Sequence, residues 1–426
     1  MAPPSPPERR TTGPRVLVVP GSYVFDNVGD VVMAQVAVAR LREALPGADL
    51  RLYAASQELL DANDLADTRA VSDRPWFVWS AAVERWRRRA PGGALLALPD
   101  EHPRRFLRLA RLGRLVSDPA AAAAFLDEVA QADLVVLPGQ GAMRDGSDRR
   151  TLRYATLALV ARAFAVPVVA VGQGIGPLDD PRLADRIGVA LRTFHGLGVR
   201  DPGPSAETVA GLGIDPARWR VTGDDAIEAV VGRGALPAPD DRIGVSLRNN
   251  RAAAVPADLP AAVGRSIGAS RPGARVELVS MMEKAARGGV SDSAFLAGVD
   301  PGAASAVVGH EARADVALDA LASCRVVISG TYHAAVFAQS LGIPVICLAA
   351  TPYYVQKLQG VLAQFGDVGG TLLDPNDPAF ERDLAAAIDR WWDGSDEVGE
   401  RLRTDAAAQA AGARRFFLDR ISVVAA

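Results

Sequence analysis

Polar residues and glycines follow several strand-like runs of this chain, where they could contact a ligand. The stretch PGSYVFDNVGD follows the apolar run VLVVP and contains Gly21, Ser22, Asn27 and Asp30. Glycines at a strand-to-helix turn let a ligand approach the backbone, and the helix N-terminus that follows favours an anion. The aspartates of this loop would repel a phosphate, so a hydroxyl-rich or amine-bearing ligand fits it better. The alternative is a structural loop in which Asp30 caps a helix over 31–45.

Two more turns in the first half have a similar composition. They are LPGQGAMRDG, which contains Gly139, Gln140 and Gly141, and VGQGIGPL, which contains Gln173. One glycine-rich turn is a weak indication of a site. Three such turns at strand ends would line one rim of a parallel sheet, and ligands of open α/β sheets bind outside that rim.

The second half places polar, cationic and aromatic residues after its strands. They are Ser246, Arg248 and Asn249 in GVSLRNN, Ser329, Gly330, Thr331, Tyr332 and His333 in SGTYHAAVFAQSLGIP, and Tyr353, Tyr354 and Lys357 in TPYYVQKLQG. Arg248 is a candidate anion clamp, with a surface arginine as the alternative. His333 would begin a helix, whose N-terminus lowers the imidazole pKa and favours a neutral ring that hydrogen-bonds a substrate oxygen or phosphate. The alternative is a buried structural histidine.

Alternating strands and helices must position these loops. Strand-like runs at 15–20, 133–137 and 167–172 alternate with helical periodicity, and a second such series begins at 242–247. The alternation predicts parallel sheets covered by helices. We therefore predict an α/β protein of two Rossmann-like domains with a cleft between them. Its divisions are a disordered tail (1–14), an N-terminal domain (15–222), a linker (223–242), a C-terminal domain (243–395) and a final helix (396–426).

Composition excludes several classes of protein. The formal charge of −3 over 426 residues shows no basic excess, which argues against a nucleic-acid partner. Cys324 and Cys347 are too few for a disulfide framework or a thiolate metal site. No run reaches the roughly 18 apolar residues of a membrane span, and the polar start does not read as a signal peptide. We expect a cytoplasmic protein without a metal ion, in which the motif RWRRRAPGG of the insert 74–130 forms a solvated helix face, with a basic patch as the alternative.

The order of the motifs resembles that of the polysaccharide pyruvyl transferase family over residues 15–366. The matching motifs are G…N-x-GD (Gly21, Asn27, Gly29, Asp30), PGQGAMRD, GQGIGP, VRDPGPSAETVAGLGI, VTGDDAIE and SG-x-x-HAAVFAQSLGIP, with Lys357 downstream. One position departs from the family, because its SGR-x-H pattern has an arginine where this chain has Thr331. That arginine would grip a carboxylate or phosphate of the donor, and its loss removes a contact of about 1.5–3 kcal/mol.

The resemblance implies a fold similar to the glycosyltransferase-B architecture, in which the final helix packs back on the N-terminal domain. It implies transfer of a pyruvyl group from phosphoenolpyruvate, a small anionic donor, to hydroxyls of a sugar or glycoconjugate acceptor. His333 would be the general acid and phosphate partner, and Arg248 the second catalytic residue. No cofactor besides the donor is implied, and homo-oligomerisation is left open.

The implied roles divide between the two halves. The donor-binding residues would be Ser246, Arg248, Asn249, Ser329, Gly330, Thr331, Tyr332, His333, Tyr354 and Lys357. The acceptor-binding residues would be Gly21, Ser22, Asn27, Asp30, Gly139, Gln140, Gly141 and Gln173. Aspartates in the first loop suit sugar hydroxyls better than phosphates.

Two other functions stay open. The first is a glycosyltransferase whose nucleotide-sugar diphosphate meets the turn at Thr331 to His333, with Tyr353 or Tyr354 stacked on the base. The second is a sugar-binding relative that kept the fold and lost the donor site. Phosphoenolpyruvate binding separates pyruvyl transfer from the first, and binding without turnover would indicate the second.

Overall fold

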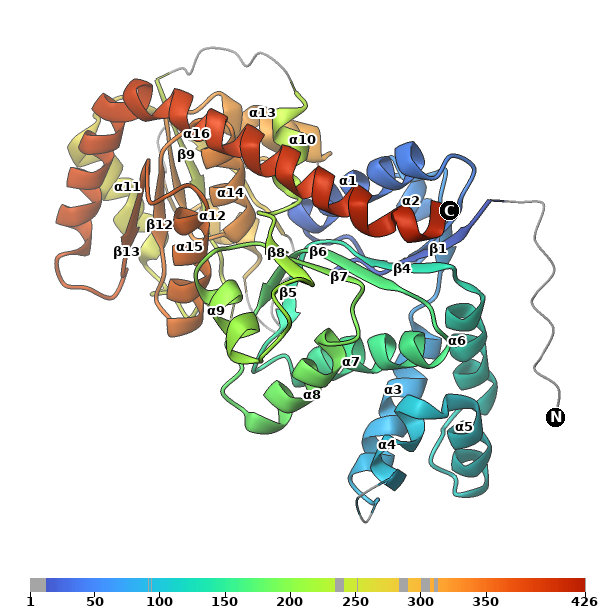
Figure 1. Cartoon of the computed structure of the whole chain (residues 1–426). Helices are drawn as coiled ribbons and strands as arrows, with labels where there is room; N and C mark the ends of the chain where they lie inside the picture. Colours follow the sequence, from blue (N-terminus) through green and yellow to red (C-terminus); the bar gives the residue numbers. More distant parts are fainter. Residues whose placement is uncertain are drawn as a thin grey trace.

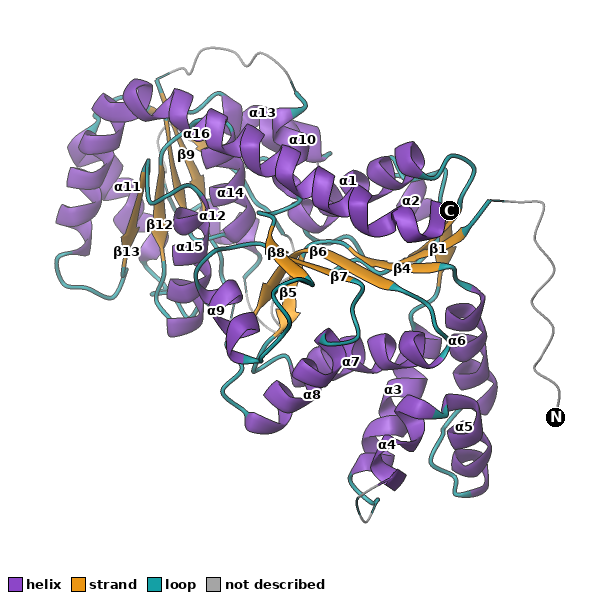
Figure 2. Cartoon of the chain, in the orientation of Figure 1, coloured by secondary structure: helices purple, strands orange, loops and turns teal. Residues whose placement is uncertain are grey.

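Two parallel β-sheets, each with helices packed against it, make up this molecule (Figure 1). The computed structural model describes residues 13–90, 92, 94–233, 241–250, 252–282, 290–299, 307–309 and 313–425. Most of the predicted tail and residues 234–240 of the predicted linker lie outside the described residues. Figure 2 shows helices covering the strands, as the alternating sequence pattern indicates. The predicted α/β class with two Rossmann-like domains is confirmed.

The first sheet has the strand order β3-β2-β1-β4-β6-β7-β8, with β5 paired to β6. Its strands are β1 (Arg15–Val18), β2 (Asp49–Tyr53), β3 (Arg69–Val71), β4 (Leu134–Leu137), β5 (Gln140–Met143), β6 (Val168–Ile175), β7 (Gly196–Val199) and β8 (Trp219–Val221). Every residue of β4, β6 and β7 is buried, as expected for parallel strands covered on both faces.

The second sheet has the strand order β10-β9-β11-β12-β13. Its strands are β9 (Arg242–Ser246), β10 (Arg275–Leu278), β11 (Val326–Ser329), β12 (Val345–Leu348) and β13 (Gly370–Leu373). Ser246 and Ser329 are register partners at the carboxyl ends of β9 and β11. The loops that follow these two strands therefore start side by side.

Helices connect the strands in both halves. In the first half they are α1 (Val28–Ala44), α2 (Gln57–Asp61), α3 (Arg74–Arg87), α4 (Ala94–Glu101), α5 (Pro103–Leu112), α6 (Pro119–Gln131), α7 (Asp148–Ala163), α8 (Pro181–Leu191), α9 (Pro204–Gly211) and α10 (Ala226–Val231). In the second half they are α11 (Leu259–Ser270), α12 (Asp292–Leu296), α13 (Ala314–Ala322), α14 (Tyr332–Ser340), α15 (Pro352–Gln364) and α16 (Phe380–Ala425). No described helix has both the length and the apolar character that crossing a membrane requires.

Helix α16 is continuous over 46 residues and packs on both sheets. Ile388 lies in the core cluster of β9 and β11, whereas Phe417 and Ile421 lie in the cluster of β1 and β2. Figure 1 shows the helix in red, passing from the second sheet to a position beside α1 and α2. The helix continues through the predicted boundary at 395 and 396, so it joins the two halves.

The insert 74–130 forms α3, α4, α5 and α6, and its aromatic residues are in the core. Trp76 and Trp79 are fully buried, and the Trp76 ring stacks on Tyr53 with 5.6 Å between centroids. The arginines of α3 leave this apolar face free for packing. The expectation of a solvated helix thus holds for only one face, because the other completes the core of the first sheet.

The loop between β1 and α1 differs from the expectation in where its helix begins. Helix α1 begins at Val28, and the Asn27 side chain caps it by accepting a 2.9 Å hydrogen bond from the Gly29 N–H. Asp30 is therefore in the first helical turn and does not serve as the cap. The Val28 N–H donates to the Met281 carbonyl at 3.1 Å, which ties this loop to the second half.

Candidate active site

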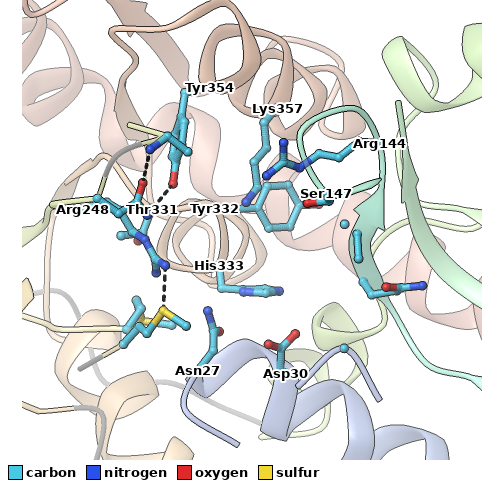
Figure 3. Close-up of a pocket in the computed structure, with 18 of the residues that line it drawn as sticks. Asn27, Asp30, Arg144, Ser147, Arg248, Thr331, Tyr332, His333, Tyr354 and Lys357 are labelled. Atoms are coloured by element: carbon cyan, nitrogen blue, oxygen red, sulfur yellow. Dashed lines mark hydrogen bonds between the residues drawn. The ribbon is translucent and has the colours of Figure 1, made fainter. Parts of the chain in front are cut away.

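A pocket of about 220 Å³ lies where loops of both halves meet (Figure 3). It contains eleven of the residues that the sequence analysis singles out in its site assignments: Gly21, Asn27, Asp30, Gln140, Gly141, Arg248, Thr331, Tyr332, His333, Tyr354 and Lys357. Figure 3 shows Asn27 and Asp30 on one side of His333, with Lys357 and Tyr354 on the other. The predicted donor and acceptor residues thus share one cavity.

Cationic side chains dominate the wall of this pocket. They are Arg144, Arg150, Arg200, Arg248 and Lys357, whereas Asp30 is the sole carboxylate among the described lining residues. Arg248 and Arg200 each have a carboxylate oxygen at 3.7 Å, from Asp292 and Asp201 respectively. Positive charge in a recess of low dielectric attracts and holds anions. The described lining of the pocket therefore carries an excess of positive charge.

Three of these arginines are absent from the sequence-based site. Arg144 ends the motif GQGAMR, two residues before a turn, and Arg200 follows directly on β7. Both positions are at the carboxyl end of the first sheet, so this placement could have identified them from the sequence. Arg150 in α7 carried no such signal, because only the packing of α7 brings it to the pocket.

Tyrosine rings hold the cations in place. The Arg200 guanidinium lies 4.1 Å from the Tyr332 ring centroid, and that of Arg144 lies 3.9 Å from the Tyr353 centroid. The Lys357 ammonium is 5.3 Å from the Tyr332 ring. Cation–π contacts orient these groups without neutralising their charge. The positive field therefore stays available to a ligand.

Two glycines of the predicted rim make room for Arg200. A Cβ built on Gly174 would overlap the Arg200 guanidinium, and one on Gly141 would lie 3.3 Å from its Nη1. The glycines of PGQGAM and GQGIGP were expected to let a ligand approach the backbone. Their observed neighbour is instead a protein side chain that itself faces the pocket.

Three predicted acceptor residues have structural partners and do not line the pocket. Gln173 is fully buried, and its Nε2 donates to the carbonyls of Leu137, Pro138 and Val171 at 2.7–3.0 Å. The Gly139 N–H donates to Asp225 at 3.1 Å, and the Ser22 hydroxyl donates to Asp26 at 2.7 Å. The assignment of these three residues to the acceptor is corrected, because they lie outside the pocket lining and these donor groups already have partners within the protein.

Four predicted donor residues support the pocket from behind. The Ser246 and Thr331 hydroxyls lie 3.0 Å apart, and the Ser329 hydroxyl donates to the Thr331 carbonyl at 2.7 Å. The Gly330 N–H donates to the Ser246 carbonyl at 2.8 Å, and the Asn249 N–H to Asp292 at 2.8 Å. Ser246, Ser329, Gly330 and Asn249 are outside the lining, so their direct donor contacts are corrected to a positioning role.

Thr331 lines the pocket at the position of the family's arginine. It is the N-cap of α14 and its hydroxyl is engaged with Ser246, which leaves no cation at this position. Arg200 and Arg144 come from the other half of the molecule and supply guanidinium groups to the same cavity. The positive charge that the motif lacks at Thr331 is therefore supplied to the same pocket by Arg200 and Arg144.

His333 lies in the first turn of α14, pressed against the β1–α1 loop. Burial lowers the pKa of its imidazole well below the ordinary 6.5, and Lys357, Arg200 and Arg248 lower it further. Its Nε2 is buried without a hydrogen-bond partner among the described residues, and Asp224 Oδ2 is 4.0 Å away. The direction of this shift is the one expected from the sequence, but its causes are burial and nearby cations, whereas the expected cause was the helix N-terminus.

Two carboxyl groups near His333 titrate close to neutral pH. Burial raises the pKa of Asp30 to about 6 and that of Asp224 to about 6. Asp30 lines the pocket, whereas Asp224 is buried behind His333. A group with a pKa near the working pH can both accept and give a proton. The pocket therefore combines an excess of cationic side chains with carboxyl groups whose pKa is near neutral.

The described residues offer no group of three or more His, Cys, Asp or Glu side chains that could hold a metal ion. A reaction without a metal or other cofactor stays a prediction.

Two Rossmann-like domains with a polar pocket at their meeting strand ends define the glycosyltransferase-B class of fold, and solved structures agree. The UDP-GlcNAc 2-epimerase from Neisseria meningitidis, bound to UDP-GlcNAc, has a TM-score of 0.54 at 12% identity, covering 96% of this chain and 99% of its own. Anabaena HepE in complex with UDP has a TM-score of 0.53 at 13% identity, covering 97% of each chain. The S. aureus MnaA structure with UDP has a TM-score of 0.56 at 13% identity, covering 96% and 98%. These likenesses show the fold.

The chain belongs to the polysaccharide pyruvyl transferase family, whose model matches residues 27–351. The matched range begins at the Asn27 cap and ends at Thr351, the cap of α15, so it contains most of the pocket lining. The resemblance drawn from the motifs is thereby confirmed. No curated protein sequence matches the chain.

Proposed function

We propose that this chain transfers a pyruvyl group from phosphoenolpyruvate to hydroxyls of a sugar or glycoconjugate acceptor. The observation that carries the proposal is the set of five cations around the half-buried His333, whose pKa is well below 6.5. A phosphate carries about −1.5 to −2 charge at pH 7 and the donor's carboxylate adds one more. Such a ligand matches a wall with a large positive excess.

The size of the pocket favours a small donor over a nucleotide-sugar. Pockets for drug-sized ligands measure roughly 300–1,000 Å³. The volume here is about 220 Å³. Moreover, the Tyr353 ring, a candidate for stacking on a base, already carries the Arg144 guanidinium at 3.9 Å. Both observations count against the glycosyltransferase alternative.

The reaction adds one proton and two acceptor oxygens to the donor. A proton goes to the methylene carbon, and the first acceptor oxygen bonds to the adjacent carbon, which becomes electron-poor as the alkene is protonated. A second acceptor hydroxyl then forms the second carbon–oxygen bond while the bond to phosphate breaks. Of the two protons that the hydroxyls lose, one balances the proton on the new methyl group and the other leaves with phosphate.

His333 is assigned as the acid, although it is neutral in the empty pocket. Nearby anions favour the charged form of an imidazole. A bound donor therefore offsets the effect of Lys357, Arg200 and Arg248, and the pKa of His333 rises. Asp224, 4.0 Å from Nε2, adds to this effect when ionised.

Asp30 and Gln140 are assigned to the acceptor. With a pKa of about 6, Asp30 is mostly ionised at neutral pH and can take a proton from an acceptor hydroxyl. Gln140 is 3% exposed and lines the pocket, yet neither its amide oxygen nor its nitrogen has a partner among the described residues. Buried amides are normally hydrogen-bonded. An acceptor hydroxyl would satisfy this one.

The experiment compares donors first and then follows product. Phosphoenolpyruvate at millimolar concentration should raise the melting temperature by mass action, and UDP- and GDP-sugars should do less. Candidate acceptors are then incubated with phosphoenolpyruvate, and the new methyl group of the ketal is followed by proton NMR alongside phosphate release.

Each contrary result points to one alternative. A larger shift with a nucleotide-sugar would overturn the proposal in favour of a glycosyltransferase. Donor binding without product across an acceptor panel would favour a non-catalytic relative.

A further inference from the structure

A second recess lies between α3 and α7, on the far side of α7 from the active site. We call it the α3–α7 groove; its polar lining residues are Ser80, Glu84, Arg85, Arg88, Asp148, Arg149 and Arg153. Its volume is about 530 Å³, more than twice that of the active-site pocket. This volume is within the usual range for ligand sites.

Several polar atoms of this groove are buried without a partner. Ser80 is 4% exposed and its hydroxyl makes no hydrogen bond to the described residues. The same holds for Glu84 Oε1, Arg85 Nη2 and Arg153 Nε. Leaving a buried polar group unsatisfied costs about 1–3 kcal/mol. Four such atoms around one cavity indicate groups arranged for a ligand.

The charge of the groove identifies the class of that ligand. Four arginines face two carboxylates, Glu84 and Asp148, and burial raises the pKa of Glu84. Arg88 and Arg149 are exposed and form no ion pair within the described part of the chain. Phe77, Ala81 and Leu152 add an apolar wall. An oxyanion on a compact, partly apolar body fits this combination.

Helix α7 connects the groove to the active site. Ser147 and Arg150 line the active-site pocket, whereas Asp148 and Arg149 line the groove. The two sites are therefore on different faces of the same first turn of α7. A helix with its side chains is about 10 Å across, so one extended molecule can reach both.

We propose that the α3–α7 groove binds an oxyanion-bearing sugar unit, carrying a carboxylate or a phosphate, of the acceptor. That this sugar unit belongs to the acceptor rests on the proposed function, whereas the binding of an anionic sugar to the groove does not. The groove then selects acceptors with an anionic substituent near the reacting sugar, and the active-site pocket holds the donor.

The test is calorimetry with glucuronate and glucose 1-phosphate, with uncharged glucose for comparison. Both anionic sugars should bind at least about tenfold more tightly than glucose, and the tighter of the two identifies the substituent. The double variant Arg88→Gln, Arg149→Gln should weaken that binding about tenfold, since it removes two exposed cations without an ion pair. Ser80→Ala should weaken it severalfold while the resistance to denaturant stays equal or rises, because an unsatisfied buried hydroxyl is removed.

Matched variants separate the groove from the active site. Arg89→Gln removes a neighbouring exposed arginine that does not line the groove, and it should leave binding unchanged. Lys357→Gln should weaken the binding of phosphoenolpyruvate and leave the binding of anionic sugars to the α3–α7 groove intact. If Lys357→Gln abolishes all sugar-anion binding and the groove variants bind like wild type, the inference is wrong. A failure to bind phosphoenolpyruvate with intact groove binding would overturn only the proposed function.

Discussion

The imidazole of His333 lies against the backbone of Gly29, so closely that a Cβ on Gly29 would overlap the ring. The two residues are in different halves of the molecule, in the first turns of α14 and α1. Gly29 belongs to the N-x-GD motif and His333 to the SG-x-x-H motif. The requirement for glycine in the first motif is therefore explained by a side chain of the second.

Gly29→Ala should strongly reduce turnover, since the new methyl group displaces the His333 imidazole or pushes the two halves of the molecule apart. A fall of about tenfold or more in kcat is expected, with a smaller change in resistance to denaturant. The control is Gly268→Ala in α11, where an added Cβ meets no atom within 4 Å. It should keep full activity and gain up to about 1 kcal/mol of stability. Equal kcat values for both variants would contradict the assigned contact.

Arg200→Lys should weaken phosphoenolpyruvate binding about tenfold, although it conserves charge. Lysine lacks the planar donor fork and cannot stack on Tyr332 as the guanidinium does at 4.1 Å. Calorimetric donor affinity is the measurement. Arg192→Lys, at an exposed position of the same half, is the control and should bind like wild type. Unchanged affinity in Arg200→Lys would remove Arg200 from the donor site.

Asp30→Asn should stabilise the protein at pH 8 while reducing activity. Burial raises the folded-state pKa of Asp30 to about 6, above the unfolded value of about 3.9. The folded state thus binds the extra proton between these values, and wild-type stability falls as the pH rises from about 4 to about 6.

Asparagine cannot ionise, so the variant escapes that fall. Because Asp30 is only half-buried within the pocket, the gain at pH 8 should be about 1 kcal/mol, vanishing toward pH 4. Denaturant unfolding across this pH range measures it, with exposed Asp185→Asn as the control that should show no such trend. A pH-independent difference would argue against a raised pKa of Asp30 in the folded state.

Donor binding should be linked to proton uptake by His333. The pKa of this group is well below 6.5 in the empty pocket and rises beside the donor's anionic groups. At pH 7.5 to 8, wild type should take up a fraction of a proton per phosphoenolpyruvate, and affinity should weaken as the pH rises. Calorimetry in buffers of different ionisation enthalpy measures the uptake.

Two variants locate that proton. His333→Gln should bind the donor without uptake, and Asp224→Asn should show reduced uptake and a lower kcat, because the carboxylate near Nε2 is gone. Uptake of the same size in His333→Gln and wild type would place the proton on another group.

Local sequence patterns identified several elements of this fold. Apolar runs such as LVVL at β4 identify buried strands, because burial on both faces of a parallel sheet dictates composition directly. The two series of alternating elements predict two sheets for the same reason. Helix α7 is buried without a break from Tyr154 to Ala161, so its burial extends beyond a single face. The helix start at Val28 was missed by three residues, because Asn27 and Asp30 are both good caps and only the backbone conformation distinguishes them.

The sequence by itself determined the two-domain α/β fold, the motif order that marks the family, and that His333, Arg248 and Lys357 line one pocket. Tertiary structure alone decided which polar residues face the pocket, so that Gln140 lines it while Gln173 donates to carbonyls of β4 and β6. It also decided that Arg200, from the first half, stacks on Tyr332 of the second. The physical reason is that a strand-end position fixes where a loop begins, whereas the direction of each side chain depends on packing between segments more than a hundred residues apart in the chain.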